Sequence, residues 1–300
     1  MYHIPVLLNE SVEGLNIKPE GVYVDVTFGG GGHSRRIMEC LGDNGHLYAF
    51  DQDEDAAKNV IDDSRFTFIQ QNFRYMKNFI QLYCGGKVDG IIADLGVSSY
   101  QFDTPEKGFS TRFNGRLDMR MNQSASVDAA SVVNTYDVSS LASVLSRYGE
   151  LRNAMGIANA ISMSRELRPI ETTNDLKDAV KSFLPRGSEN KVLAQIFQAL
   201  RIEVNEEMKV LELFLNQCAD VLRPGGRLVV LSYHSLEDRL VKNYMKTGNA
   251  DGVLEKDFFG NQLTPYKLIT NKPIVPSDSE LQSNNRARSA KLRIAERRER

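Results

Sequence analysis

Short apolar stretches alternate with amphipathic segments through the first hundred residues. The stretches rich in β-branched and aromatic residues predict strands at 22–26, 46–51, 66–70 and 88–94. Between them, apolar residues recur at three- and four-residue spacing, which predicts helices at 34–41, 54–61 and 74–84. Strands that alternate with helices in this way are typical of a parallel sheet covered on both faces. We therefore predict an α/β, doubly wound fold for this part of the chain.

The same alternation resumes toward the C-terminus, after a long helical interruption. A helix is expected at 205–222, a turn at Pro224-Gly225-Gly226, and further strands at 227–232, 265–270 and 288–295. More than a hundred residues separate the fourth strand from the fifth, although a crossover needs only one helix and two short loops. Within this intervening stretch, apolar residues at helical spacing predict helices at 138–148, 151–165, 174–184 and 190–202, with Asp137 and Thr173 as caps. We expect a helical domain at 104–203, inserted into a domain formed by 1–103 and 204–300.

Four consecutive glycines, Gly29 to Gly32, stand between the first predicted strand and its helix. Glycine allows unusual dihedral angles and a close approach to the backbone, and the start of a helix offers unpaired N–H groups at the same place. Ser34 is expected to cap that helix. A flexible surface loop is the alternative, but such loops are rarely framed by a strand and an amphipathic helix. We expect a nucleotide-like ligand at this turn.

Two strand ends add carboxylates at the edge where ligands bind to open α/β sheets. Asp51 ends the second strand about twenty residues after the glycines, where a carboxylate can accept hydrogen bonds from ribose hydroxyls. Asp94 ends the fourth strand, beside the expected position of the reacting atom, although a cap of the next turn is the alternative. Dinucleotides and S-adenosylmethionine both use this layout. The glycine spacing is a poor match to the dinucleotide pattern G-x-G-x-x-G, and the ligand is expected to contain adenosine.

Composition indicates an ordinary globular enzyme. Lys and Arg number 37 and Asp and Glu 39, so any affinity for nucleic acid has to come from a local patch. Cations alternate with aromatic residues, which could stack on an unpaired base, at Lys107, Phe109, Arg112, Phe113, Arg116 and Arg120. A solvated loop is the alternative for this stretch. Seven Lys and Arg residues crowd the last fifteen positions and could add phosphate contacts.

The cysteines and histidines bear on whether the protein has disulfides, a catalytic thiolate or a metal site. Cys40, Cys84 and Cys218 are widely spaced in helical patterns, which indicates neither a disulfide framework nor a thiolate nucleophile at a strand end. The four histidines are too scattered to suggest a metal site. No leader segment and no stretch of about 18 apolar residues is present, so we expect a cytoplasmic protein without a membrane partner.

Nine ordered motifs resemble those of the MraW (RsmH) family. Members of this family are bacterial S-adenosylmethionine-dependent methyltransferases that modify the exocyclic N4 of a decoding-centre (P-site) cytidine in 16S ribosomal RNA. The resemblance covers almost the whole chain and includes Thr27-Phe-Gly-Gly-Gly-Gly-His-Ser34 and Asp94-Leu-Gly-Val-Ser-Ser-Tyr-Gln101. The other motifs are at 3–10, 107–110, 117–121, 197–202, 224–228, 232–239 and 286–293.

The resemblance implies a class I methyltransferase fold, with a Rossmann-like, mostly parallel seven-stranded sheet interrupted by a helical substrate-recognition domain. It implies S-adenosylmethionine as the cofactor and 16S ribosomal RNA within the small subunit as the substrate. The cofactor contacts of the family match Gly31, Gly32, His33, Asp51, Phe73, Asp94 and Gln101. The oligomeric state is open, and a homodimer is compatible with the sequence.

Methyl transfer to a cytosine amino group needs alignment of donor and acceptor and no covalent intermediate. The N4 lone pair is delocalised into the ring, so an acceptor for the amino hydrogens would favour a more localised pair, and Asp94 is the expected catalytic residue. His234 and Tyr233, just beyond the fifth strand, are expected to face the target base, and Ser235 and Asp238 resemble a helix-capping pair.

Three other functions stay open from the sequence. A non-catalytic ribosome assembly factor would bind the subunit without using a methyl donor. A small-molecule methyltransferase would keep the glycine turn but would need neither the helical insertion nor the arginine-rich segments. A nicotinamide oxidoreductase would bind NAD in place of S-adenosylmethionine.

Overall fold

The computed structural model describes residues 5–299, and the chain divides into two compact units. The sheet unit comprises the chain up to Gly96 and from Met208 onward, and the helical unit comprises Val97–Glu207. The bounds predicted for the inserted domain, 104–203, lie within the helical unit. The first motif begins with His3 and Ile4, which lie outside the described residues. None of the helices in residues 5–299 combines the length and the apolarity that a membrane crossing requires.

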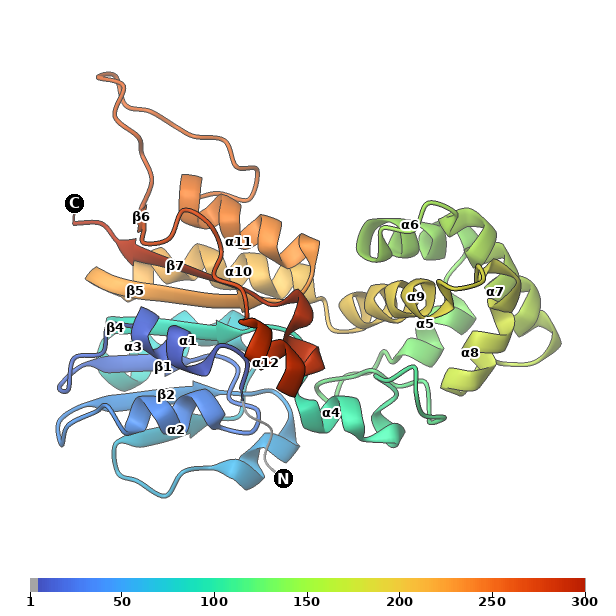
Figure 1. Cartoon of the computed structure of the whole chain (residues 1–300), viewed down its shortest axis with the longest axis horizontal. Coiled ribbons are helices and arrows are strands. Elements are labelled where there is room, and N and C mark those ends of the chain that lie inside the picture. Colours follow the sequence, from blue (N-terminus) through green and yellow to red (C-terminus); the bar gives the residue numbers. More distant parts are fainter. Residues whose placement is uncertain (1–4, 300) are drawn as a thin grey trace. The chain divides into compact units, whose positions relative to one another are not determined.

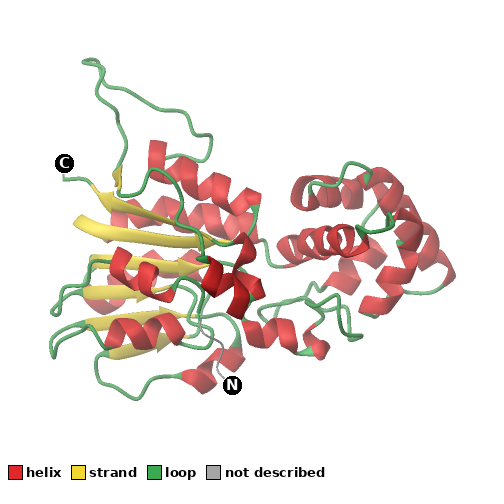
Figure 2. Cartoon of the chain, in the orientation of Figure 1, coloured by secondary structure: helices red, strands yellow, loops and turns green. Residues whose placement is uncertain are grey.

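A seven-stranded sheet forms the centre of the sheet unit (Figure 2). The strand order is β3-β2-β1-β4-β5-β7-β6. The first five strands run parallel to their neighbours, whereas β7 runs antiparallel to both β5 and β6. Their bounds are β1 Val22–Asp25, β2 His46–Phe50, β3 Phe66–Ile69, β4 Val88–Asp94, β5 Leu222–Ser232, β6 Tyr266–Leu268 and β7 Lys291–Arg297. The predicted α/β fold with a Rossmann-like, mostly parallel seven-stranded sheet is confirmed.

Helices cover both faces of this sheet (Figure 1). One face packs against α3 (Met76–Cys84), α10 (Glu207–Val221) and α11 (Ser235–Thr247). The other packs against α1 (Leu8–Gly14), α2 (Gly32–Met38) and α12 (Asp278–Ser283). Within β1, Val24 belongs to the first core and Tyr23 to the second. Because successive strand residues point to opposite faces, a strand buried on both sides has to be apolar throughout, as the sequence pattern predicted.

Three local predictions differ from the structure. The segment expected as a helix at 54–61 forms the 3₁₀ helix η1 (Glu54–Asn59), and a 3₁₀ turn, η2 (Phe73–Tyr75), precedes α3. The expected turn at 224–226 is a bulge inside β5, because the partners of Val88 and Gly90 in β4 are Leu222 and Arg227. Gly225 takes a φ of 75° at this bulge, a conformation that glycine adopts without strain.

The helical unit has its own hydrophobic core. Its elements are α4 Ser99–Asp103, η3 Pro105–Lys107, α5 Ala129–Thr135, α6 Val138–Gly149, α7 Ala154–Leu167, α8 Thr173–Ala179, η4 Lys181–Phe183 and α9 Glu189–Val204. Helix α6 packs against both α7 and α9, and buried side chains of α9 line the middle of the core. The side chain of Asp137 caps α6 as predicted, whereas α8 is capped by Thr172 and not by Thr173. The last 3₁₀ helix of the chain, η5 (Asn285–Ser289), belongs to the sheet unit.

Candidate active site

Three aspartates stand at one edge of the sheet. Asp25 ends β1, Asp94 ends β4, and Asp51 follows β2 directly. Because β1 lies between β2 and β4 and all three run parallel, these residues share the carboxyl edge of the sheet. In open α/β sheets this edge is where ligands bind.

The glycines in the turn that follows β1 differ in how much space surrounds the position where a Cβ atom would be. A Cβ atom at Gly31, where φ is 74°, would lie 2.9 Å from Cε2 of Phe28, and one at Gly32 would lie 2.2 Å from Cγ of Pro5. Gly30 differs, because a Cβ atom there would have no other atom within 4 Å. The protein's own packing therefore requires glycine at 31 and 32, whereas Gly30 borders open space in which a ligand could contact the backbone.

Asp51 is held by backbone donors on both carboxylate oxygens. The N–H of Gly29 donates to Oδ2 at 2.7 Å and the N–H of Asp53 donates to Oδ1 at 2.8 Å. Burial raises the pKa of Asp51 to about 6, although these two hydrogen bonds act in the opposite direction. Each carboxylate oxygen has a second lone pair, so the group can accept two more hydrogen bonds, as the ribose hydroxyls of an adenosine ligand would require.

Asp94 is fixed by residues of both neighbouring strands. Its backbone N–H donates to Oγ1 of Thr27, which follows β1, at 2.7 Å. The hydroxyl of Tyr233, which follows β5, donates to Oδ1 of Asp94 at 2.6 Å. Burial and the Asp94 charge raise the pKa of Tyr233 well above its ordinary value, so the phenol stays a donor. The Asp94 side chain is 25 % exposed, which leaves the carboxylate accessible to a substrate.

His33 lies against the other carboxylate oxygen of Asp94. Its Nδ1 is 3.7 Å from Oδ2, too far for a hydrogen bond but close enough for an electrostatic interaction. Burial lowers the pKa of His33, which favours the neutral imidazole at pH 7. The structure therefore brings His33, Asp94 and Tyr233 together at the carboxyl edge of β4.

Asp25 is a residue that the sequence analysis did not assign. It is buried, accepts a hydrogen bond from the hydroxyl of Ser34 at 2.7 Å and another from the N–H of Thr27 at 3.0 Å, and burial raises its pKa. The prediction that Ser34 caps α2 is wrong, because the N-cap is Gly31 and the Ser34 side chain is used by Asp25. The position of Asp25 at a strand end, shared with Asp51 and Asp94, was the signal that could have identified it.

Phe73 and Gln101 stay predictions as cofactor contacts. Phe73 begins η2 in the sheet unit, is partly buried, and packs edge to face on Phe214 with ring centroids 5.3 Å apart. Gln101 belongs to the helical unit, where it is buried. It forms a capping box with Ser98, in which its N–H donates to Oγ of Ser98 and its Oε1 accepts from the N–H of Ser98.

Three side chains expected to contact RNA are directed into the helical unit instead. Phe109 is 5 % exposed and belongs to the core, so its ring is not available to stack on a base. Lys107 is buried, with its ammonium 5.1 Å from the ring centroid of Tyr100. Arg120 donates from two nitrogens to the buried carboxylate of Asp118. These side chains stabilise the unit, and their contact with RNA stays a prediction.

The remaining members of that stretch face solvent. Arg112 and Phe113 are exposed, and 42 % of the Phe113 surface is accessible. Arg116 has a side chain that is 64 % exposed, but its guanidinium forms an ion pair with Asp128 at 3.0 Å. Arg112 and Phe113 therefore stay the strongest candidates for RNA contact, with Arg116 beside them in the sequence.

His234 caps α11. Its Nδ1 accepts from the N–H of Glu237 at 3.4 Å, and the Glu237 carboxylate accepts in return from the N–H groups of Tyr233 and His234. The predicted capping pair of Ser235 and Asp238 is therefore shifted by one residue. Asp238 instead accepts hydrogen bonds from two cations of β7. His234 is partly buried, and whether it faces a target base stays a prediction.

Comparison with known proteins places the chain among methyltransferases. The profile of the MraW methylase family matches residues 1–298. "Ribosomal RNA small subunit methyltransferase H" of Phocaeicola vulgatus is 57 % identical over 298 residues, which are 99 % of this chain and 98 % of that protein. The proteins of the same name from Flavobacterium johnsoniae and Flavobacterium psychrophilum are 58 % identical over 295 residues and 59 % identical over 290 residues. These two matches cover 98 % and 97 % of this chain, and 97 % and 99 % of the respective relatives.

Proposed function

Because this chain belongs to the MraW methylase family, we propose that it transfers a methyl group from S-adenosylmethionine to the exocyclic N4 of a decoding-centre cytidine in 16S ribosomal RNA. The names of the relatives supply the small-subunit RNA as the substrate. The observation that carries the proposal is the row of aspartates at one sheet edge, with Asp94 held between Thr27 and Tyr233. The substrate is then the RNA of the small ribosomal subunit, and the enzyme works in the cytoplasm, where subunits are assembled.

The residues at the glycine turn fit the proposed methyl donor. Gly30 offers backbone beside open space, and Asp51 keeps lone pairs for two hydroxyl donors. When bound, the donor supplies an electrophilic methyl group on a positively charged sulfur. We assign the ribose to Asp51, because this carboxylate stands at the end of the strand next to β1, about twenty residues after the glycines.

Asp94 is assigned to the cytosine amino group rather than to the sulfur. The positive charge of the donor disappears during transfer, so a carboxylate in contact with sulfur would stabilise the ground state more than the transition state. A carboxylate that accepts a hydrogen bond from N4 favours localisation of the nitrogen lone pair instead. With the donor bound, methyl transfer to N4 would leave the electron pair of the broken methyl–sulfur bond on sulfur, and Asp94 would accept the proton that N4 loses.

Orientation of Asp94 matters in this mechanism because the nitrogen, methyl carbon and sulfur have to be in line. Tyr233 holds Oδ1, and Thr27 holds the backbone N–H of the same residue. Burial lowers the pKa of His33, so its imidazole adds no positive charge beside Oδ2 at pH 7. We propose that the Asp94 carboxylate, oriented by Tyr233, receives the amino group.

We further propose that the helical unit contacts the RNA through Arg112 and Phe113. The arginine can pair with a phosphate, and the exposed ring can stack on an unpaired base. The target base has to leave its stack for N4 to reach the donor, which makes such a stacking platform useful.

The test is transfer of a labelled methyl group to small subunits that lack the modification, followed by nucleoside analysis. We expect label in N4-methylated cytidine. At saturating donor, Asp94→Ala should lower turnover by about 10²- to 10⁴-fold, the usual contribution of an acid or base group. Asp62→Ala, which alters an exposed aspartate of the same unit, serves as the control and should keep full activity. Label at C5 or on a ribose oxygen, or near-normal turnover of Asp94→Ala, would contradict the proposal.

A further inference from the structure

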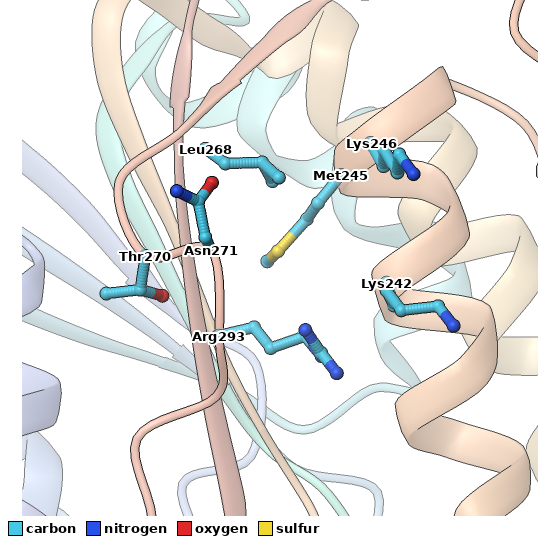
Figure 3. A pocket seen from close by; sticks show the side chains of 7 residues that line it. All are labelled: Lys242, Met245, Lys246, Leu268, Thr270, Asn271 and Arg293. Atoms are coloured by element: carbon cyan, nitrogen blue, oxygen red, sulfur yellow. The ribbon is translucent and has the colours of Figure 1, made fainter.

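A cavity of about 220 Å³ lies in the sheet unit, between α11 on one side and the edge strands β6 and β7 on the other (Figure 3). Lys242, Met245 and Lys246 line it from the helix. Leu268 of β6, the following residues Thr270 and Asn271, and Arg293 of β7 complete the lining. None of these residues belongs to the glycine turn or to the set of aspartates described above.

The lining is cationic and contains no acidic side chain. Within residues 5–299, neither Lys242 nor Lys246 forms an ion pair or a side-chain hydrogen bond. Arg293 donates from Nε to Asp238 at 2.6 Å, which leaves the other guanidinium nitrogens for a further acceptor. Asp238 also accepts from Lys291 at 3.1 Å, so one carboxylate is shared by two cations and the cluster keeps a net positive charge.

Lys242 and Lys246 stand four residues apart on α11 and therefore project from the same side of the helix. Like charges at this spacing destabilise a helix in the absence of a counter-charge. Asn271 adds an amide without a hydrogen bond among the described residues, and the buried Thr270 hydroxyl beside it has no partner there either. Ammonium, guanidinium, amide and hydroxyl groups share the ability to donate to an oxyanion.

The size of the cavity limits the ligand. Sites for drug-sized molecules have volumes of about 300–1,000 Å³, so this cavity suits a single phosphate group better than a whole nucleotide. The apolar floor from Met245 and Leu268 has no group that would recognise a base edge. The lining is therefore suited to bind a phosphate through its charge, without contacts that depend on the base sequence.

We propose that this cavity binds a backbone phosphate of the RNA substrate; this inference rests on the proposed function. Helix α11 begins at Ser235, close in sequence to Tyr233, whose hydroxyl contacts Asp94. At a rise of about 1.5 Å per residue, Lys242 and Lys246 lie about 10 and 16 Å along the helix from that end. Both lysines therefore lie several phosphate spacings from that end of the helix, so the phosphate would belong to a nucleotide other than the target cytidine.

The test compares the full-length double variant Lys242→Gln/Lys246→Gln with the wild type in binding to unmodified small subunits between low and moderate salt. Loss of one phosphate contact should raise the Kd for the subunit. It should also make the slope of log Kobs against log salt less negative by about 0.7, the value for one phosphate of a single strand. At saturating subunit, kcat should be unchanged, and so should the affinity for the methyl donor.

Lys256→Gln/Lys267→Gln is the matched control, because it removes the same charge from two exposed lysines of the sheet unit that do not line the cavity and that form no ion pair among the described residues. Thermal unfolding of both double variants checks that the fold is intact. A salt slope and Kd equal to those of the control would overturn the inference. Stabilisation of the wild type by inorganic phosphate, abolished in the cavity variant while subunit binding is unchanged, would also overturn it in favour of a free anion. Absence of methyl transfer by a wild type that still binds subunits would refute the proposed function alone, because binding does not require turnover.

Discussion

Protonation of Asp51 is expected to weaken binding of the methyl donor. In the free protein this carboxyl has a pKa of about 6, because burial disfavours the charge more than the hydrogen bonds from Gly29 and Asp53 favour it. The charged form accepts hydrogen bonds from two ribose hydroxyls, whereas the protonated form has one oxygen occupied by its own proton. Donor binding therefore favours the charged form, and affinity should rise with pH up to about 7 and then level off.

The magnitude follows from the fraction of Asp51 that is charged. With a pKa of about 6, roughly nine-tenths of the molecules carry the charge at pH 7 and roughly one-tenth at pH 5. If the charged form alone binds well, the Kd for the donor rises about tenfold between these two pH values, which corresponds to about 1.4 kcal/mol. Added hydrogen-bond donors lower the pKa of Asp51, so binding near pH 6 should also release protons into the buffer.

Isothermal titration calorimetry from pH 5 to 8, in two buffers of different ionisation enthalpy, measures both quantities. Asp51→Asn should bind more weakly at pH 7 and should lose most of the pH dependence. Glu54→Gln removes an exposed carboxyl three residues away and should retain the dependence of the wild type. Affinity that does not change between pH 5 and 7 would refute the role of Asp51. An undiminished dependence in Asp51→Asn would assign the titration to another group, such as Asp25, whose pKa burial also raises.

Three further predictions use contrasts between neighbouring residues. Gly30→Ala should leave the unfolding temperature within about 1 °C but weaken donor binding, whereas Gly32→Ala should destabilise the protein by about 1–3 kcal/mol, as thermal denaturation would show, because its Cβ would overlap Pro5. Tyr233→Phe removes the donor to Asp94 and should lower kcat about tenfold to hundredfold with donor affinity intact; equal kcat values would contradict the positioning role. Phe109→Ala should cost about 3–5 kcal/mol of stability, and Phe113→Ala less than about 0.5 kcal/mol. In subunit-binding assays Phe113→Ala should weaken the free energy of binding by about 1–3 kcal/mol if the ring of Phe113 stacks on a base.

Strands and their ends were the most predictable part of this molecule. A parallel sheet buried on both faces forces continuous apolar runs such as 88–94, and the polar residue that closes each run marks the edge where the helices begin. Asp51 and Asp94 could therefore be placed at one edge from the sequence pattern, before any contact was known. Asp25 also ends a strand at this edge, but it was not predicted as a site residue, because the glycines that follow it were taken as the signal of this motif.

Residues in segments without periodicity were the least predictable. Phe109 and Phe113 stand in one loop among cations, and the sequence contains no feature that separates the buried ring from the exposed one. Arg120 was expected to face RNA, but Asp118, two residues earlier, binds its guanidinium. Burial of an irregular segment depends on the helices that pack around it, so it follows from tertiary structure and not from local pattern.

The predicted N-caps of α2 and α11 were wrong for a related reason. Other groups compete for the hydrogen bonds of the side chains that were expected to cap these helices. Ser34 is a good N-cap by residue type, yet its hydroxyl donates to the buried Asp25, because leaving a buried carboxylate without this partner would be more costly than leaving the first turn of α2 without a side-chain cap. At α11 the cap moved to His234, which left Asp238 for Arg293 of β7. Both shifts are set by groups distant in sequence.

The environment of Asp94 shows most clearly what strand order adds to strand prediction. Thr27 and Tyr233 are separated by about two hundred residues in the chain, but β4 lies between β1 and β5, so the residues after these two strands reach Asp94 from opposite sides. With its backbone N–H bonded to Thr27 and its carboxylate bonded to Tyr233, Asp94 loses little further freedom when substrate arrives. Such preorganisation is worth more in catalysis than the strength of either hydrogen bond alone. The adjacency of three strands, and not a local motif, therefore creates the candidate catalytic geometry. It follows that Thr27 and Tyr233 act through Asp94 and should be tested by their effect on turnover, with donor affinity as the reference.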